Sequence, residues 1–267
     1  MRYPKGSLQL NESRDFPLLR QILHSEFITH SQLFEFARLN HFERSRKSFD
    51  WRIRRLVDGE LATRQTLPGF TGGCVYSIAA SGAAFLQGTG EYCLVGRRKL
   101  NGKETEPSVF HAIELSEIHL SALRGGVLVR WISSMEIRSQ NELTRFGFAK
   151  DYDAVVTVRT EAGEPRFALE YERSPKPKRY YIDVAAALDR EPHIGRVLYL
   201  ANNYDLLRFV SSFFRTSQRQ VFFGLAKDWH AHLLDMPVLC NATDRTIRFS
   251  DTLDHAGAPP NPVAVAL

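Results

Sequence analysis

The segment DAVVTVRTEAGEPRFALEYERSPKPKRYY, residues 153–181, decides how the second half of this chain folds. Two β-prone runs, 155–158 and 167–172, flank a turn at Ala162–Gly163, and this order is typical of a β-hairpin. Alternate side chains of a strand share a face. The hairpin therefore directs Glu170 and Glu172 the same way and brings Asp153 beside them, so the segment predicts three carboxylates at one edge of a sheet.

Two interpretations of these three carboxylates are open. Clustered carboxylates repel one another unless water screens them or a hard cation such as Mg²⁺ binds through oxygen ligands. In the alternative, Asp153 is an ordinary acid at the start of a strand, and the two glutamates lie on a solvated face paired to Arg173 or Arg166, since exposed carboxylates are common. The basic run at residues 176–179 favours a site that handles phosphate.

Length and composition limit the class of protein. The chain has 267 residues, 43% hydrophobic and 24% charged, which suits one large or two modest soluble domains. It contains no apolar run of the roughly 20 residues that cross a bilayer, and its first residues lack the apolar core of a signal peptide. Cys74, Cys93 and Cys240 are scattered and have no metal-ligand spacing, which excludes a zinc ribbon. We expect a cytoplasmic protein with no membrane partner.

The positive charge is concentrated in the first part of the chain. Residues 1–107 hold 16 Lys and Arg against 11 Asp and Glu, and residues 108–267 hold the remaining 19 of each. Because all of the excess positive charge belongs to the first part, we expect that part to bind a polyanion.

The first 88 residues show three helical patterns followed by two strands. Apolar spacing predicts a first helix over 14–24. A second helix begins at a cap, either Thr29 or Ser31, and runs to about residue 40. A third helix covers about 45–57 and is ended by Gly59. Strands at 61–66 and 75–78 flank a turn at 68–73 that is rich in Pro and Gly. This order, ending in VYSIAASGAAFL, resembles the winged helix-turn-helix family over about residues 14–88, and the resemblance implies a DNA-binding domain.

The third predicted helix has the side chains expected of a recognition helix. Polar and basic residues lie opposite its apolar stripe, and Arg64 of the hairpin could reach a backbone phosphate or the minor groove. The alternative is a solvated basic face, which is the usual fate of a charge run. The candidate contacts to double-stranded DNA are Arg44, Arg46, Lys47, Ser48, Trp51, Arg52, Arg55 and Arg64.

The rest of the chain predicts a mixed α/β domain. Residues 89–107 are expected to be a linker, and the basic residues at 97–99 are a further candidate phosphate contact. Residues 108–250 are expected to form the domain, and residues 251–267 a flexible tail rich in Pro and Ala. The elements expected in the domain are a helix at 109–123, strands at 127–132 and 135–138, the hairpin, a helix at 176–190, a strand at 196–201, a helix at 205–214 and a final strand at 220–225.

Asp153, sixteen intervening residues and then Glu170-Tyr171-Glu172 resemble the D-X(n)-(D/E)-X-K pattern of the restriction-endonuclease-like superfamily, the PD-(D/E)XK fold. Preceded by a winged helix and by His111-Ala-Ile-Glu114, these motifs resemble the replication-relaxation family of bacterial mobile elements, over about residues 14–225. The resemblance implies a DNA-binding protein of plasmid or mobile-element replication, mobilisation or transcription control, with a nuclease-like domain that has lost activity.

The same resemblance assigns roles to the acids. Asp153 and Glu170 would bind Mg²⁺, Glu172 would position or deprotonate water, and Glu114 would be a fourth acid on a helix. Two departures are plain, because Glu172 stands where the family pattern has Lys, and Tyr152 stands where it has Pro. Lys176 and Lys178 follow a Ser-Pro turn and could reach back to the acids, although they are off the strand.

Two functions therefore stand as hypotheses, a DNA-binding protein and a Mg²⁺-dependent DNA endonuclease that uses Asp153, Glu170 and Glu172. A third, structural hypothesis has the second domain bind a protein partner of the mobile-element system. Winged-helix proteins often pair on symmetric sites, so a homodimer is also an expectation. The pair His230 and His232 diverges on a helix, so it is a weak candidate for metal binding.

Overall fold

The computed structural model describes residues 9–67, 70–91, 106–243 and 245–253. The chain forms two compact units, Met1–Leu120 and Ser121–Leu267, called here the N-terminal and C-terminal units. The predicted mixed α/β class is confirmed, since helices and strands occur in both units. Among the helices of the described residues, none combines the length and apolar character needed to span a membrane.

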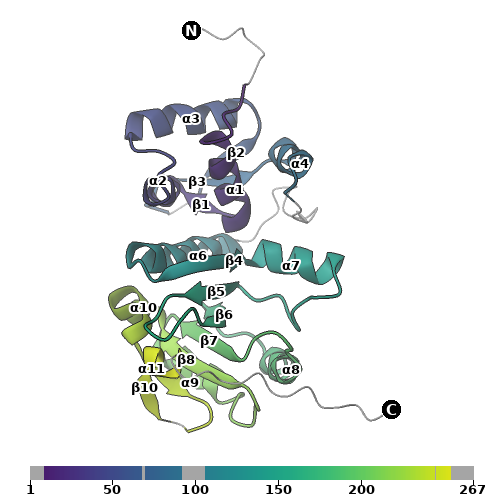
Figure 1. Ribbon diagram of the computed structural model, residues 1–267, viewed down its shortest axis with the longest axis vertical. Coiled ribbons are helices and arrows are strands. Elements are labelled where there is room, and N and C mark those ends of the chain that lie inside the picture. The colour runs from purple at the N-terminus through teal and green to yellow at the C-terminus, as the bar shows by residue number, and fades with distance from the viewer. Residues whose placement is uncertain (1–8, 68–69, 92–105, 244, 254–267) are drawn as a thin grey trace. The chain divides into compact units, whose positions relative to one another are not determined.

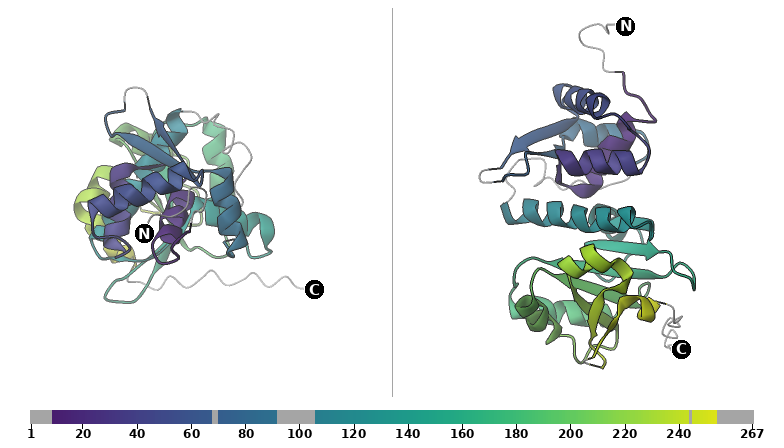
Figure 2. Two further views of the ribbon diagram at one scale, coloured as in Figure 1. Left: turned by 90° about the horizontal axis from the view of Figure 1, so that it is seen from above. Right: turned by 90° about the vertical axis from the view of Figure 1, so that its left-hand side faces the viewer.

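The N-terminal unit contains the predicted helices and hairpin (Figure 1). Its elements are α1 (Asp15–Ser25), β1 (Ile28–Thr29), α2 (His30–Leu39), α3 (Arg46–Asp58), β2 (Ala62–Thr66), β3 (Cys74–Ile78), α4 (Ala80–Gly88) and α6 (Glu106–Arg124), whose last turn belongs to the C-terminal unit. The short strand β1 was not predicted; it pairs with β3 and completes a sheet of order β1-β3-β2. Figure 2 shows the β2–β3 hairpin extending to one side of the helices.

The ends of α2 and α3 follow from local sequence. Thr29 begins α2 with a capping box, in which its side chain accepts from the amide of Gln32 while the Gln32 side chain accepts from the amide of Thr29. Ser45 caps α3 by accepting from the amide of Ser48, and Gly59 follows its last turn. The predicted caps at Thr29 and Gly59 are confirmed.

The core of the N-terminal unit includes side chains from α6. Val109 and Ile113 of α6 pack with Phe27 and Val75, and the Gln32 side chain donates to the carbonyl of Ile113 at 2.8 Å. The division between the units therefore falls inside this long helix, later in the chain than the predicted start of the second domain at residue 108.

The C-terminal unit is built on one seven-stranded sheet (Figure 1). Its elements after α6 are β4 (Leu128–Ser133), α7 (Ser134–Leu143), β5 (Ala154–Val158), β6 (Arg166–Glu172), α8 (Lys178–Asp189), β7 (Arg196–Ala201), α9 (Tyr204–Ser211), β8 (Gln220–Leu225), α10 (Ala226–His232), the 3₁₀ turn η1 (Leu233–Asp235), β9 (Pro237–Cys240), β10 (Thr246–Arg248) and α11 (Phe249–Leu253).

Strand order in this sheet is β10-β9-β8-β7-β6-β5-β4. The first three strands in chain order, β4, β5 and β6, pair antiparallel, whereas β6, β7 and β8 pair parallel. Each parallel pair needs a crossover connection, which α8 and α9 supply. Strand β6 therefore lies inside the sheet, with the antiparallel strands β5 and β4 on one side and the parallel strands β7 and β8 on the other.

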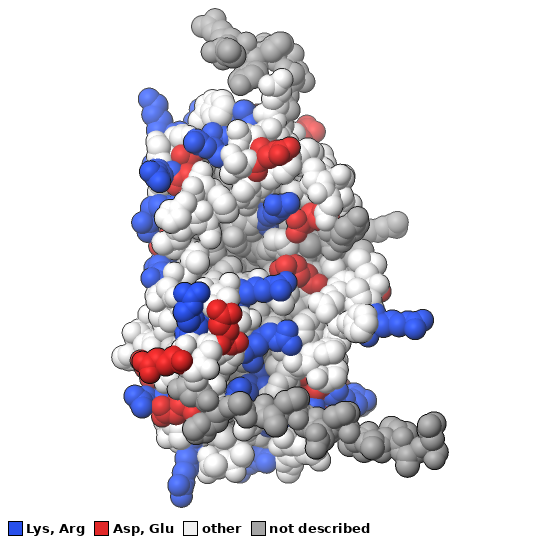
Figure 3. All heavy atoms as spheres, viewed as in Figure 1, with Lys and Arg blue, Asp and Glu red and all other residues white. Residues whose placement is uncertain are grey.

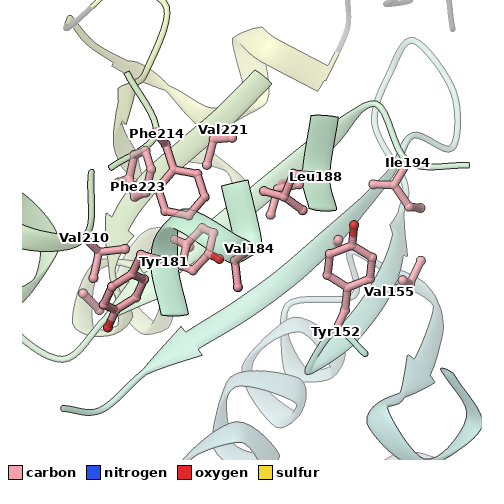
Figure 4. Packing of buried hydrophobic residues seen from close by; sticks show 14 of the residues in the cluster. Tyr152, Val155, Tyr181, Val184, Leu188, Ile194, Val210, Phe214, Val221 and Phe223 are labelled. Atoms are coloured by element: carbon pink, nitrogen blue, oxygen red, sulfur yellow. The ribbon is translucent and has the colours of Figure 1, made fainter. Parts of the chain in front are cut away.

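Apolar side chains cover both faces of the sheet. Helices α8 and α9 pack on one face, where the labelled side chains of Figure 4 meet, including Tyr181, Val184 and Phe223. On the other face, Phe167 makes edge-to-face ring contacts with Trp229 and Phe249. Because both faces are covered, a polar side chain in the middle of β6 has to be buried.

Several predictions about elements were wrong. Residues 135–138 belong to helix α7, not to a strand. Strand β8 is not the final strand, because β9 and β10 follow it. Helix α11 reaches Leu253, past the predicted start of the tail at residue 251. The basic residues 97–99 of the predicted linker, and the tail from residue 254, lie outside the described residues.

Candidate nucleic-acid interface and carboxylate cluster

Helix α3 presents an exposed basic face. Arg44, Arg46, Lys47 and Arg54 are exposed on this helix and the turn before it. Trp51 is 49% exposed on the same helix, an unusual fraction for a large aromatic side chain. The guanidinium carbon of Arg46 lies 4.9 Å from the centroid of the Phe34 ring, and its Nε lies 3.2 Å from Oδ1 of Asp50. These contacts orient the guanidinium group, and the side chain stays 49% exposed.

A groove of about 490 Å³ lies between α3 and the β2–β3 hairpin. Three arginines line it: Arg46 and Arg54 from the helix and Arg64 from the hairpin, with Asp50 and Asp58 also at its wall. Figure 3 shows Lys and Arg side chains gathered in the region where Figure 1 has α3. The helix and the hairpin thus present cations to one concave surface.

A chain of polar groups fixes the floor of this groove. His30 contacts Asp50 through Nε2 and the Tyr76 hydroxyl through Nδ1, each at 2.9 Å, and the Cys74 thiol donates to that hydroxyl at 3.3 Å. Burial lowers the pKa of His30, although the hydrogen bond to Asp50 opposes this. The neutral imidazole therefore joins helix α2 to both α3 and the hairpin.

Three predicted DNA contacts are engaged inside the unit. Arg52 and Arg55 bind the fully buried carboxylate of Asp15 at 3.1 and 2.6 Å. Arg52 also binds Glu43 at 3.0 Å, and the Ser48 hydroxyl donates to the same carboxylate at 2.7 Å. Arg52 and Arg55 hold α3 against the start of α1, and all three side chains are partly buried.

The hairpin β5–β6 brings Asp153, Glu170 and Glu172 together. Val155 is opposite Ala168, so the register extended by two residues along each strand puts Asp153 on the same face as both glutamates. The Asp153 carboxylate accepts from the amide of Tyr171 at 2.7 Å. Both glutamates are only 2% exposed, so the alternative of a solvated face is wrong for them.

Two lysines bind the buried glutamates. The Lys150 ammonium lies 2.5 Å from Oε1 of Glu170, and the Lys176 ammonium lies 3.0 Å from Oε1 of Glu172. Lys176 also donates to the hydroxyl of Tyr180 at 3.3 Å. The sequence suggested that a lysine after the Ser-Pro turn could reach back, and Lys176 does so.

Burial and charge perturb these groups in a consistent way. Burial raises the pKa of Glu170 to about 7, Lys150 opposes the rise, and Asp153 adds to it. Burial also raises the pKa of Glu172, against the charge of Lys176. Burial alone would lower the pKa of each lysine, but the negative charge of the paired glutamate raises both overall. The lysines are therefore cations at neutral pH.

Tyr199 of β7 lies beside Glu170 in the parallel register. The residue is 2% exposed, and its hydroxyl has no hydrogen-bond partner among the residues that the structure describes. Tyr199 and Glu172 line one small cavity. Burial and the nearby carboxylates raise the pKa of the Tyr199 hydroxyl, so it is a neutral donor. An unpaired buried donor costs about 1–3 kcal/mol.

Glu191 holds the segment that carries Lys150. This carboxylate is fully buried and accepts from the amide of Ala149 at 2.8 Å and from the hydroxyl of Tyr152 at 2.9 Å. It also accepts from the amide of His193 at 2.8 Å. Neither Lys150 nor Glu191 was a sequence candidate, although the spacing Lys150-Asp-Tyr-Asp153 places a lysine near the first acid in any extended segment.

The remaining candidates lie elsewhere. Glu114 is half-buried on α6, in the part of the chain that belongs to the N-terminal unit. His230 contacts the Ser121 hydroxyl at 2.7 Å, and His232 is exposed. Within the described residues no three His, Cys, Asp or Glu side chains are arranged to hold a metal ion. Two of the three clustered carboxylates carry ammonium partners, so the cluster as folded does not fit Mg²⁺.

Comparison of the chain with protein-family models, curated proteins and solved structures gave no match.

Proposed function

We propose that this protein binds double-stranded DNA through a winged helix-turn-helix, with α3 as the recognition helix and the β2–β3 hairpin as the wing. The observation that carries the proposal is the groove between these two elements, lined by the guanidinium groups of Arg46, Arg54 and Arg64. Arginines on two rigid elements can contact phosphates on both sides of a DNA groove at the same time.

The chemistry of α3 divides its residues into two roles. Arg44, Arg46, Lys47 and Arg54 contact phosphate or base edges, and the exposed Trp51 packs against the sugar-phosphate backbone. Ser48, Arg52 and Arg55 act indirectly, because they fix α3 through Glu43 and Asp15. This division revises the sequence-based interface, in which all of them contact DNA.

In this proposal the C-terminal unit is a nuclease-like domain that has lost its activity. The supporting observations are the order of its strands and the lysine partners of its carboxylates. The protein then serves replication, mobilisation or transcription control of a plasmid or mobile element in the cytoplasm. Binding as a homodimer, or with a protein partner from the same element, belongs to the same proposal.

The test is DNA binding by fluorescence anisotropy as a function of salt. Replacing Arg46, Lys47 and Arg54 together by Ala should weaken binding at least about tenfold, and should reduce the slope of log affinity against log salt by up to about 3. The control is Arg215→Ala, an exposed arginine of the C-terminal unit, which should leave both quantities unchanged. Unchanged binding by the triple variant would remove α3 as the recognition helix.

A Mg²⁺-dependent endonuclease is the second candidate. The meeting of Asp153, Glu170 and Glu172 at one edge of the sheet favours it, and the pairing of both glutamates to lysines opposes it. The measurement is nicking of supercoiled plasmid with Mg²⁺ or Mn²⁺ by the wild type and by Asp153→Asn. Nicking by the wild type alone would establish the nuclease, whereas intact DNA with normal binding supports the first proposal.

A further inference from the structure

Lysines of the same unit compensate most of the negative charge of the carboxylate cluster. When fully ionised, Asp153, Glu170 and Glu172 carry three negative charges, and the ammonium groups of Lys150 and Lys176 supply two positive ones. One divalent cation would supply the same two positive charges to the same three carboxylates. Buried carboxylates need such compensation because an isolated buried charge is strongly unfavourable.

The lysines use the carboxylate oxygens that a cation would need. Lys150 binds Oε1 of Glu170, Lys176 binds Oε1 of Glu172, and the Tyr171 amide donates to Oδ2 of Asp153. A metal ion entering the cluster would meet two ammonium groups of like charge at short range, in a buried region where such repulsion is large. Both lysines would have to leave first.

Tyr199 is an independent sign that the cluster can accept a further ligand. Its hydroxyl is buried and has no hydrogen-bond partner within the described part of the chain, and Tyr199 lies next to Glu170 on the neighbouring strand. Buried polar groups are nearly always hydrogen-bonded, and an exception calls for an ion, a water or a function. The cavity that Tyr199 shares with Glu172 has no room for a water molecule in this arrangement. The missing partner would therefore enter only after the cluster rearranges.

We propose that Lys150 and Lys176 take the place of a divalent cation and lock a latent cation site formed by Asp153, Glu170 and Glu172. The wild-type protein is metal-free because its own ammonium groups fill the site. Removing the lysines opens it to Mg²⁺ or Mn²⁺, hard cations that prefer carboxylate oxygens. This inference concerns the C-terminal unit alone and does not depend on DNA binding.

The test uses the full-length chain without DNA. Mn²⁺ binding is measured by electron paramagnetic resonance and calorimetry for the wild type and for Lys150→Met combined with Lys176→Met. The double variant should bind one Mn²⁺ at least about tenfold more tightly than the wild type, because two like charges are removed. With a chelator present, the Tm of the double variant should be lower than that of the wild type. Adding Mn²⁺ or Mg²⁺ should raise this Tm again, since a ligand that binds only the folded state stabilises the folded state.

Two controls make the result specific. Lys178→Met with Lys227→Met removes the same charge from two exposed positions and should bind no more Mn²⁺ than the wild type. Adding Asp153→Asn to the first double variant should abolish the gained binding. If the double variant does not fold, Lys176→Met alone, which removes the more exposed lysine, should show a smaller gain. The proposal would be overturned if the wild type bound Mn²⁺ as tightly as the double variant. It would also be overturned if no folded lysine variant bound Mn²⁺ more tightly than the wild type.

Discussion

Among the described residues, each buried acidic side chain has a cation or a hydrogen-bond donor as partner. Asp15 is fully buried and held by Arg52 and Arg55, and Glu170 is held by Lys150. The cause is the same in both units, because a charge removed from water is tolerated only where a partner replaces the lost hydration. Removing one partner is therefore expected to cost more than the ion pair contributes.

Glu43 shows how this pairing makes stability depend on pH. Burial opposes ionisation of Glu43, but hydrogen bonds from Ser48, Arg52 and two backbone amides lower its pKa below the usual 4.5. A lowered pKa in the folded state contributes stability that is present above about pH 4.5 and is lost as the pH falls through the folded value. We expect Glu43→Gln to destabilise the N-terminal unit by about 2 kcal/mol at pH 7.

This prediction is checked by urea unfolding at pH 7 and near pH 3. The difference in unfolding free energy between Glu43→Gln and the wild type should shrink at the lower pH. Below about pH 4.5 the carboxyl group takes up a proton in the unfolded chain, so its lowered pKa in the folded state contributes less stability. Glu161→Gln, in the exposed turn of the β5–β6 hairpin, should match the wild type at both values. An equal difference at both pH values would mean that the Glu43 charge is not what stabilises α3.

At the scale of the element, short polar signals decide where α7 begins. Ser133 accepts from the Glu136 amide, and the Glu136 side chain accepts from the amide of Ser133. This capping box is visible in the sequence as Ser-x-x-Glu. The strand predicted over 135–138 was wrong, because the alternation of Met135 and Ile137 is typical of a strand but the capping box begins a helix. Met135 and Ser139, four residues apart, share one face of α7, whereas Ile137 lies about 200° from Met135 and is buried as well.

The segment between α7 and β5 has no regular structure, so side-chain contacts determine where it lies, and the Glu191 carboxylate provides two of them. Glu191 binds donors at Ala149 and Tyr152 within this segment and at His193 beyond α8. We expect Glu191→Ala to destabilise the C-terminal unit by about 3 kcal/mol or more, because it removes the acceptor of three hydrogen bonds. Glu191→Gln should cost less, because the amide keeps one acceptor oxygen.

Urea unfolding followed by tryptophan fluorescence measures the loss of stability in Glu191→Ala and Glu191→Gln, since Trp229 is fully buried in this unit. Glu164→Ala, exposed in the hairpin turn, is the matched control and should be neutral. If the urea midpoint of unfolding of Glu191→Ala equals that of the wild type, other contacts hold the segment that carries Lys150.

At the scale of the whole molecule, core and charge are divided between two units. The excess positive charge lies in the first 107 residues, and the largest aromatic cluster lies in the C-terminal unit, where Phe214 is fully buried against Tyr199 and Phe223. Phe214→Ala should destabilise the C-terminal unit by about 3–5 kcal/mol. At temperatures where the variant stays folded, its affinity for DNA should equal that of the wild type.

Differential scanning calorimetry and anisotropy on the same preparation check both parts of this prediction. Loss of DNA affinity by folded Phe214→Ala would show that the C-terminal unit takes part in binding. Phe146→Ala, which removes a phenylalanine that is 74% exposed, is the control and should leave both the Tm and the affinity unchanged.

The sequence by itself determined the local structure, because local structure depends on nearby residues. Apolar spacing predicted α1, α2 and α3 and the strands of both hairpins, and Thr29 and Gly59 marked helix ends. The face shared by Glu170 and Glu172 followed from the two-residue period of a strand. Short elements without a strong pattern, such as β1 and β10, were beyond this kind of prediction.

Only the tertiary structure decided which charges meet. Helix α3 carries four arginines in the same basic stretch of sequence. The buried Asp15 of another helix binds Arg52 and Arg55. Arg46 and Arg54 line the groove instead. Lys150 reaches Glu170 because Glu191, 41 positions further along the chain, holds its segment. Partners of this kind are set by packing between distant segments, and no local pattern encodes them.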